Sequence, residues 1–366
     1  MIEITDLLRL LVQKNASDLH IRSGCVPVIR VDGKLFSVKM DKVSPSDAES
    51  IAMSVMNDKQ KEDFANRLEC DLSMGVPNIG RFRLNIYRQR GSINMALRIV
   101  PTVIPGFDEL RLPSAIKTLS ENARGLILVT GPTGCGKSTT LSSMIDYINS
   151  TRSCHIITIE DPIEFLHKDK KSIVSQRELG IDTLDYPEAL KHVVRQDPDV
   201  ILVGEMRDLA TMAAAITAAQ TGHLVLSTVH TIDTVQTISR IVDLFPPHQQ
   251  NQIRYMLADT LKGVVSQRLM PHESGKGRVA AIEVLVCTAI VRKMIEENTL
   301  GEISNIIKQG AYYGMQTFNQ ALVKLYNEKL VTLEDALNTA SNPEELMLTV
   351  RGIESGTDAG NMFDHT

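Results

Sequence analysis

The sequence contains no tryptophan, and aromatic residues of all kinds make up only 4% of its 366 residues. Its five cysteines form no C-x-x-C pair, so neither a disulfide framework nor a cysteine zinc site is expected. No stretch approaches the roughly 20 apolar residues that a membrane-spanning helix needs. The N-terminus lacks the basic and long apolar segments of a signal peptide. The cysteine pattern favours reduced thiols. Without a membrane-spanning segment, association with a membrane is expected only through a partner.

An excess of basic charge is also missing. The 39 Lys and Arg residues are balanced by 44 Asp and Glu residues, which gives a formal net charge of −5. This balance argues against nucleic-acid binding as the main function, although a local basic patch would be compatible with it. The 43% hydrophobic and 23% charged residues are typical of a folded globular chain. The length predicts two domains.

The first hundred residues predict a small α+β domain. Apolar residues mark one face of a short helix at residues 4–11, and strands are expected near residues 18–22 and 28–31. Asp32 and Gly33 suit a tight hairpin turn. Ser44 and Pro45 predict the start of a helix that runs to about Arg67. Three further strands are expected near residues 69–74, 80–88 and 92–100.

The rest of the chain predicts a linker and a second, α/β domain. Residues 101–113 hold three prolines and a glycine, as linkers often do. Short apolar runs then alternate with helical stretches, which is typical of parallel strands buried on both faces. These runs are residues 126–130, 155–159, 200–203 and 223–227. Residues 246–351 are predicted to be helical apart from an extended piece near 279–287, and residues 352–366 to be disordered.

Residues 131–138 read Gly-Pro-Thr-Gly-Cys-Gly-Lys-Ser and match the phosphate-loop pattern G-x-x-x-x-G-K-[ST] without a mismatch. The glycines let backbone N–H groups face phosphate oxygens, and the following helix N-terminus adds partial positive charge. Lys137 is expected to reach the β and γ phosphates, and the Ser138 hydroxyl to bind Mg²⁺. A merely structural turn is the alternative. The predicted nucleotide-binding residues are Gly131, Pro132, Thr133, Gly134, Cys135, Gly136, Lys137, Ser138 and Thr139.

Cys135 lies inside this loop. The N–H groups and the helix N-terminus are expected to lower the pKa of its thiol and to make it the main target of an alkylating reagent. The alternative is a small, buried and inert residue that fills a gap.

Two of the predicted strands are followed by acids. Glu205 follows the strand at residues 200–203, whereas Asp199 precedes it, so Glu205 is predicted to be the acid near Mg²⁺, directly or through water. Glu160, Asp161 and Glu164 follow the strand at residues 155–159. Because the carboxyl ends of the strands form the ligand crevice, these acids are expected on the nucleotide side. Glu164 is predicted to be the base that orients or deprotonates water. A solvated acidic turn is the alternative.

One histidine and two arginines are further candidates. His230 follows a strand, where it could sense the γ-phosphate or hydrogen-bond an acid, or simply pack. Arg81 and Arg83 share one face of a strand, opposite Phe82 and Leu84. A solvated face is the default interpretation. The alternative is a pair of arginine fingers for a triphosphate of the same or a neighbouring subunit, and nucleic-acid binding is less well supported.

Several segments together resemble a known family, the secretion-type hexameric ATPases. The Walker A, Asp box, Walker B and His box segments read GPTGCGKS, IEDPIE, VGEMRD and TGHLVLSTVHT. Other segments resemble the PilT subfamily of type IV pilus retraction ATPases: ASDLHI, RFRLNIYRQRG, SRIVDLFPP and VVSQRL. The similarity extends to about residue 351.

The resemblance implies a PAS-like domain over residues 1–100 and a RecA-like ATPase domain over residues 114–351, with ATP and Mg²⁺ as ligands. It implies that Lys137 binds phosphate, that Glu164 is the general base, that Glu205 is the Walker B acid and that His230 belongs to the His box. The family's N-terminal arginines map to Arg81, Arg83 and Arg98. The implied assembly is a cytoplasmic homohexamer beneath the inner-membrane platform protein of the pilus.

Subfamily features favour retraction. Pilus extension and type II secretion ATPases usually carry an extra N-terminal domain and often a four-cysteine zinc insertion, and neither is found here. The retraction signature A-I-R-N-L-I-R-E corresponds to residues 290–297. Arg292, Ile295 and Glu297 agree with it, whereas Ile290, Lys293 and Glu296 depart from it. The open alternatives are a PilU-like accessory ATPase acting beside a paralogue, another secretion ATPase, a nucleic-acid-stimulated NTPase and a non-hydrolysing nucleotide-binding regulator.

Overall fold

The computed structural model describes residues 3–352 and divides the chain into two compact units. The first unit comprises the residues up to 103 together with residues 164–166. The second unit comprises residues 104–163 and the chain from residue 167 onward. The segment predicted to be disordered lies outside the described residues except for Gly352. Within the described residues, no helix is both long and apolar enough to cross a bilayer.

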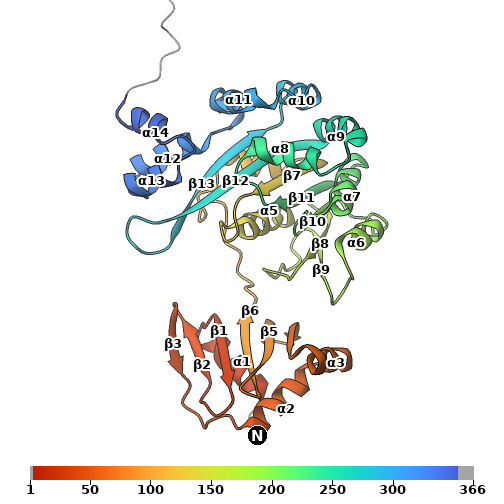
Figure 1. Ribbon diagram of the computed structural model, residues 1–366, viewed down its shortest axis with the longest axis vertical. Coiled ribbons are helices and arrows are strands. Elements are labelled where there is room, and N and C mark those ends of the chain that lie inside the picture. The colour runs from red at the N-terminus through yellow and green to blue at the C-terminus, as the bar shows by residue number, and fades with distance from the viewer. Residues whose placement is uncertain (1–2, 353–366) are drawn as a thin grey trace, which may run out of the picture. The chain divides into compact units, whose positions relative to one another are not determined.

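The first unit is built on an antiparallel sheet of six strands (Figure 1), in the order β3-β2-β1-β6-β5-β4. Its strands are β1 (Asp18–Arg22), β2 (Val28–Val31), β3 (Lys34–Ser37), β4 (Glu69–Val76), β5 (Gly80–Gln89) and β6 (Ser92–Ile99). Three helices contribute to the core of this unit: α1 (Ile4–Gln13), α2 (Pro45–Val55) and α3 (Asp58–Arg67). The tight turn is confirmed, because Asp32 and Gly33 have φ angles of 48° and 78° between paired strands.

The single helix predicted from Pro45 to about Arg67 was wrong. The structure has two helices, because the chain is extended at Met56 and Asn57. Asn57 accepts a hydrogen bond from the N–H of Gln60, whose side chain accepts one from the Asn57 N–H. This capping box satisfies donors at the start of the second helix and therefore favours a new helix over continuation of the first.

The second unit contains a seven-stranded sheet in the order β13-β12-β7-β11-β10-β8-β9. All neighbouring pairs are parallel except β12 with β13. The strands are β7 (Gly125–Thr130), β8 (His155–Glu160), β9 (Ile173–Glu178), β10 (Val200–Val203), β11 (Leu224–Val229), β12 (Leu261–Pro271) and β13 (Arg278–Val286). The four predicted parallel strands are confirmed as β7, β8, β10 and β11.

Helices cover both faces of this sheet (Figure 1). One face packs against α6 (Tyr186–Val193), α7 (Leu209–Gln220), α8 (Thr234–Asp243) and α9 (Pro247–Thr260), and the other against α4 (Ser114–Ser120) and α5 (Lys137–Thr151). Alternate strand residues serve the two cores: Ile201 and Val203 face the first set of helices, whereas Val200 and Leu202 face the second. Burial on both faces explains the continuous apolar runs of the strands.

The expectation that residues 246–351 are helical apart from one extended piece was wrong for β12. This strand of eleven residues lies between β7 and β13, so neighbours that are distant in sequence stabilise it. Helices follow the two strands: α10 (Ala289–Glu296), α11 (Ile303–Gln309), α12 (Phe318–Asn327), α13 (Leu333–Thr339) and α14 (Pro343–Val350), with short 3-10 turns at Leu300–Glu302 and Gly310–Tyr313. The helices α12, α13 and α14 form a separate small core against Met270 and Val279.

His167 is a buried titratable group in the second unit. Burial lowers its pKa from an ordinary 6.5 to about 4, although the nearby Asp146 acts in the opposite direction. Its Nδ1 atom has no hydrogen-bond partner among the described residues. The folded chain therefore holds this imidazole in its neutral form at pH 7.

We expect the variant His167→Phe to lose less stability than the wild type between pH 6.5 and pH 4. In the wild type the unfolded state binds a proton at His167 below pH 6.5 while the folded state excludes it until about pH 4, which costs up to about 3 kcal/mol. Denaturant unfolding at pH 7 and pH 4.5 measures this difference. His248→Gln removes an exposed histidine as a control and should keep the wild-type slope. Equal slopes for His167→Phe and the wild type would contradict the expectation.

Candidate nucleotide-binding and hydrolysis site

The phosphate loop joins the end of β7 to the start of α5. Gly131, Gly134 and Gly136 have φ angles of 138°, 80° and 97°, a region that favours glycine. A Cβ atom on Gly131 would lie 2.4 Å from the carbonyl oxygen of Gln267, so this position has no room for a side chain. Among the described residues, no group accepts a hydrogen bond from the N–H of Thr133, Gly134 or Gly136. These donors form a cradle that fits phosphate oxygens.

Lys137 is the first residue of α5, and it is 8% exposed. Its Nζ donates hydrogen bonds to the carbonyl oxygens of Gly131, at 2.8 Å, and Pro132, at 3.0 Å. Burial lowers the pKa of the ammonium, while Cys135 and Glu205 act in the opposite direction. A buried cation inside an otherwise uncharged loop is complementary to an anionic ligand. The next residue, Ser138, is exposed, and Thr139 is partly exposed.

The expectation of a low pKa for Cys135 was wrong. The residue is 3% exposed, and burial raises the pKa of its thiol although Lys137 and backbone N–H groups lower it. Its Sγ lies 2.6 Å from where a Cβ of Gly131 would be, so the thiol fills the space beneath the loop. Desolvation outweighs the helix N-terminus because the sulfur points into the protein. This environment favours the alternative of a buried and inert residue.

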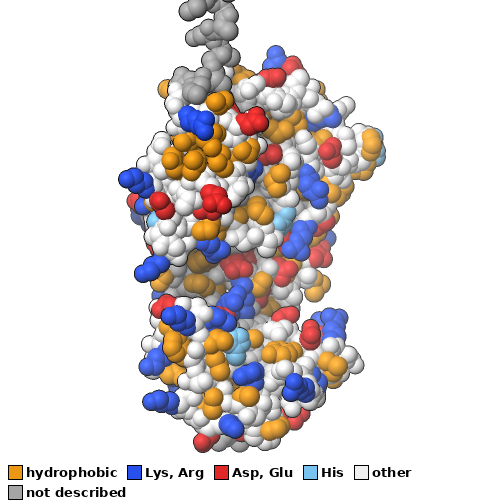
Figure 2. All heavy atoms as spheres, turned by 60° about the vertical axis from the view of Figure 1, so that its left-hand side comes forward, with side chains coloured by type: hydrophobic (Ala, Val, Ile, Leu, Met, Phe, Trp, Pro, Cys, Tyr) orange, Lys and Arg blue, Asp and Glu red, His pale blue; other side chains and the backbone are white. Residues whose placement is uncertain are grey.

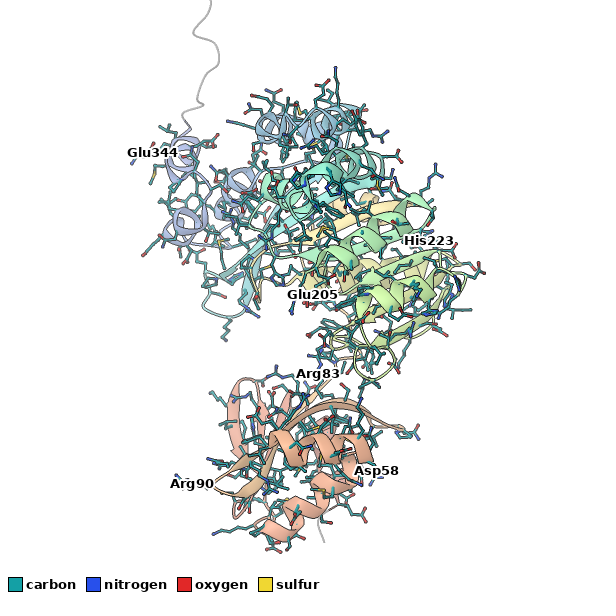
Figure 3. All side chains as sticks on the ribbon, turned by 45° about the vertical axis from the view of Figure 1, so that its right-hand side comes forward. Asp58, Arg83, Arg90, Glu205, His223 and Glu344 are labelled. Carbon is teal, nitrogen blue, oxygen red and sulfur yellow. The ribbon has the colours of Figure 1, made fainter. Side chains whose placement is uncertain are left out.

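Glu205 lies two residues after β10 ends, and its carboxylate has two partners. Arg207 Nε lies 2.6 Å from Oε1, and His230 Nε2 lies 3.3 Å from Oε2. The Glu205 side chain is 13% exposed. Figure 3 shows Glu205 and His223 at opposite ends of the large sheet. Asp199 lies at the far end, where its carboxylate accepts a hydrogen bond from the N–H of His155.

His230 follows the last residue of β11, and its side chain is 43% exposed. Of the two contacts expected for it, the structure contains the hydrogen bond to an acid, Glu205. Its role in the reaction stays a prediction.

The three acids at the end of β8 and just beyond it have different surroundings. Glu160 is 7% exposed and accepts hydrogen bonds from Thr158 Oγ1 at 2.7 Å and Gln176 Nε2 at 3.0 Å. Asp161 is exposed. Glu164 belongs to the first unit, where Arg83 Nη1 donates to its Oε1 at 3.1 Å. The structure therefore places Glu160 in a hydrogen-bonded core position, and it leaves the role of Glu164 as base a prediction.

The arginine candidates all lie in the first unit. Arg81 and Arg83 share one face of β5, and Phe82 and Leu84 are buried on the other, which confirms the predicted alternation. Arg98, on β6 beside Arg83, donates from Nε to Asp18 Oδ1 at 2.8 Å. Their contribution to a nucleotide site remains a prediction.

The sequence interpretation missed three residues of the site. Arg207 binds the Glu205 carboxylate, and Gln267 Nε2 donates to Thr140 Oγ1 at 2.9 Å behind the phosphate loop. Tyr186 extends from α6 to the carboxyl end of β10. Arg207 was detectable, because it stands two positions from Glu205 in one motif, whereas Tyr186 and Gln267 are brought to the site only by the fold.

The residues present fit Mg²⁺ better than a metal held by protein ligands alone. Among the described residues, no group of three His, Cys, Asp or Glu side chains could hold a metal ion. An exposed hydroxyl on Ser138 and a carboxylate on Glu205 are the available oxygen ligands. Mg²⁺ commonly takes one or two such ligands together with substrate phosphates and water.

The chain is similar to several known proteins. The family model "Type II/IV secretion system protein" matches residues 2–338. The "Type IV pilus retractation ATPase PilT" of Pseudomonas aeruginosa is 44% identical over 93% of this chain and 99% of its own. The "Type IV pilus ATPase PilU" of the same organism is 42% identical over 97% of this chain and 94% of its own. A crystal structure of the pilus retraction motor PilT with bound ADP matches with a TM-score of 0.87 and 47% identity, over 95% of this chain and 99% of that one.

We expect the variant Lys137→Ala to lose ATP hydrolysis by on the order of 100-fold or more, because the phosphate charge loses its buried partner. The measurement is phosphate release from Mg²⁺ and ATP. Lys276→Ala, which removes an exposed lysine from the turn between β12 and β13, is the control and should hydrolyse ATP like the wild type. Undiminished turnover in Lys137→Ala would refute the assignment of the phosphate loop.

Proposed function

The chain belongs to the Type II/IV secretion system protein family, and from this membership we propose that it is an ATPase that uses Mg²⁺ and ATP to retract type IV pili. One observation carries the proposal. A complete phosphate loop, with its buried Lys137, lies in the same unit as the paired acid Glu205, on a chain that matches a relative named as a retraction ATPase over almost its whole length. The relative's name supports pilus retraction as the work performed.

The proposed roles follow from the site's chemistry. The N–H groups of Thr133, Gly134 and Gly136 and the Lys137 ammonium hold the phosphates, and Ser138 and Glu205 hold the Mg²⁺ bound to the nucleotide. Bound Mg²⁺ would neutralise charge on the phosphates. His230 and Arg207 orient the Glu205 carboxylate.

A water-activating base and further positive charge complete the proposal. Glu164 takes the proton from the attacking water, and arginines of the first unit stabilise the charge of the transition state. The candidates for this second role are Arg81, Arg83 and Arg98. Mere nucleotide binding would need neither a base nor these arginines.

The proposed assembly is a homohexamer with nucleotide sites between subunits. It acts in the cytoplasm at the base of the pilus, on the inner-membrane platform protein, and a paralogous retraction ATPase is a further candidate partner. Relatives named as type IV pilus ATPases support this placement. Acidic and basic side chains are intermixed on the face of the second unit seen in Figure 2, which does not favour a nucleic-acid track.

An accessory ATPase is the second candidate function. The chain is nearly as similar to PilU, at 42% identity, as to PilT, at 44%. Both candidates share the hydrolytic chemistry, so they differ only in whether retraction depends on this chain alone.

We expect the variant Glu164→Gln to keep ATP binding and to lose most hydrolysis, because an amide preserves the shape of the side chain but cannot accept the proton. A fluorescent ATP analogue measures binding, and phosphate release measures turnover. The variant Glu121→Gln changes a surface acid whose partner is the Tyr147 hydroxyl, and it serves as the control. Loss of binding in Glu164→Gln would instead indicate a structural acid.

Deleting the gene tests the function directly. We expect cells that still assemble pili but neither retract them nor move by twitching, because the motor that shortens the filament is missing. Fluorescently labelled pili show extension and retraction separately. The wild-type and Lys276→Ala chains should restore retraction, whereas Lys137→Ala should not. Persisting retraction would favour the accessory role, and loss of pilus assembly would contradict both candidates.

A further inference from the structure

Tyr186 lies where the strands β8 and β10 of the second unit end, and the proposed mechanism assigns it no role. It is the first residue of α6, whose start is capped by Asp185. The residue is 9% exposed, and it belongs to the core cluster that includes Ile159 of β8 and Val203 of β10. The ring is therefore fixed by packing, and only the hydroxyl reaches the edge of the sheet.

The hydroxyl lies against Gly204, which separates β10 from Glu205. A Cβ atom on Gly204 would be 2.8 Å from Tyr186 Oη and 3.2 Å from the carbonyl oxygen of Ile159. The φ angle of Gly204 is not in the left-handed region, so backbone conformation does not require glycine there. Glycine is required there because a side chain would occupy the space of the Tyr186 hydroxyl.

The surroundings of this hydroxyl are acidic. Glu205, Asp161 and Glu160 all act on it electrostatically, while Arg207 acts in the opposite direction. Burial, the largest cause, and then these carboxylates raise the pKa of Tyr186, so the hydroxyl remains an O–H donor at neutral pH. The Tyr186 hydroxyl makes no hydrogen bond to another described residue, and it is not one of the buried polar atoms that lack a partner, so solvent reaches it.

A donor fixed among carboxylates and without a protein acceptor selects an acceptor from outside the chain. Glu205 is the proposed acid on the metal side of the nucleotide, and its two oxygens already contact Arg207 and His230. An ordered water at this point would accept from Tyr186 and could donate to a carboxylate or a phosphate oxygen.

We propose that Tyr186 is a positioning residue of the ATPase site. Its hydroxyl holds an ordered water beside the Glu205 carboxylate, where Mg²⁺ would bind. The inference rests on the proposed Mg²⁺-dependent ATPase function and adds a specific residue to it. Gly204 has the complementary role, because its missing side chain admits the hydroxyl.

The variant Tyr186→Phe removes only the hydroxyl and keeps the ring. A fluorescent ADP analogue is expected to bind more tightly with Mg²⁺ than in EDTA. In Tyr186→Phe we expect this gain in affinity to fall about fivefold, in line with one lost hydrogen bond, while the affinity in EDTA is unchanged. The kcat for ATP should fall by a similar factor with little change in KM. Tyr326→Phe, on α12, is the control and should match the wild type in each measurement.

Gly204→Ala gives a second and independent test. In the wild-type background the added methyl group meets the Tyr186 hydroxyl, so we expect the same loss of the Mg²⁺ effect. In the Tyr186→Phe background the tyrosine oxygen is absent and only the closeness of the Ile159 carbonyl oxygen remains, so the alanine should cost less than in the wild type, and the two changes should be non-additive.

Three outcomes overturn the inference. Tyr186→Phe with wild-type Mg²⁺ dependence and kcat would show that the residue only packs. Weaker binding both with and without Mg²⁺ would show a structural role. A crystal structure of the wild type with Mg²⁺ and nucleotide, with no water within hydrogen-bonding distance of Oη, would refute the proposed geometry. If the wild type itself shows no Mg²⁺ effect, the proposed function fails as well, and the two failures are thereby distinguished.

Discussion

The parallel register of four central strands is the constraint on which the candidate site depends. Val203 of β10 lies beside Ile159 of β8 on one side and Ser227 of β11 on the other, while Val229 of β11 lies beside Thr130 of β7. Parallel strands in register end at one edge, so the segments that follow them meet there whatever their distance in sequence. The phosphate loop, Glu205 and His230 follow β7, β10 and β11, and Glu160 is the last residue of β8. Burial of the strands on both faces keeps this edge rigid, as positioned chemistry requires.

The electrostatics of that edge are arranged around charges that the protein only partly compensates. The Lys137 ammonium is buried against two carbonyl oxygens, which accept hydrogen bonds from two of its three N–H donors but carry no net charge. The Glu205 carboxylate is shared by Arg207 and His230. A cation near Glu205 must therefore share this carboxylate with two side chains, and a phosphate near Lys137 replaces neutral acceptors with a charged one. The charges of Lys137 and Glu205 therefore favour a ligand that combines a metal ion with a phosphate over a metal ion or a phosphate alone.

Local patterns in the sequence predicted those parts of the fold that local physics determines. Apolar runs fixed the central strands, and the glycine spacing of residues 131–138 fixed the phosphate loop. The strand β12 was missed because it carries Ser266 and Gln267 in its interior, and these are buried only because Thr130 and Thr140, far away in sequence, bind them. The pKa of Cys135 was misjudged for a related reason: the helix N-terminus is visible in the sequence, but the burial that outweighs it is not. Tyr186 escaped notice because only the fold brings it to Gly204.

The residues proposed for hydrolysis do not distinguish a retraction motor from an accessory ATPase, because the departures from the retraction signature lie elsewhere in the chain. Departures from the retraction signature fall on α10, where Ile290 and Lys293 are exposed, while Ile295, which agrees with the signature, is buried in the core. The exposed departures leave the packing of the helix unchanged, and they alter the surface that it offers to other molecules. Because α10 packs against α9 and α11 rather than against the phosphate loop, these differences concern what the helix contacts and not how ATP is split. The exposed departures thus lie on a surface of the second unit, whereas the residues proposed for hydrolysis lie elsewhere in the chain.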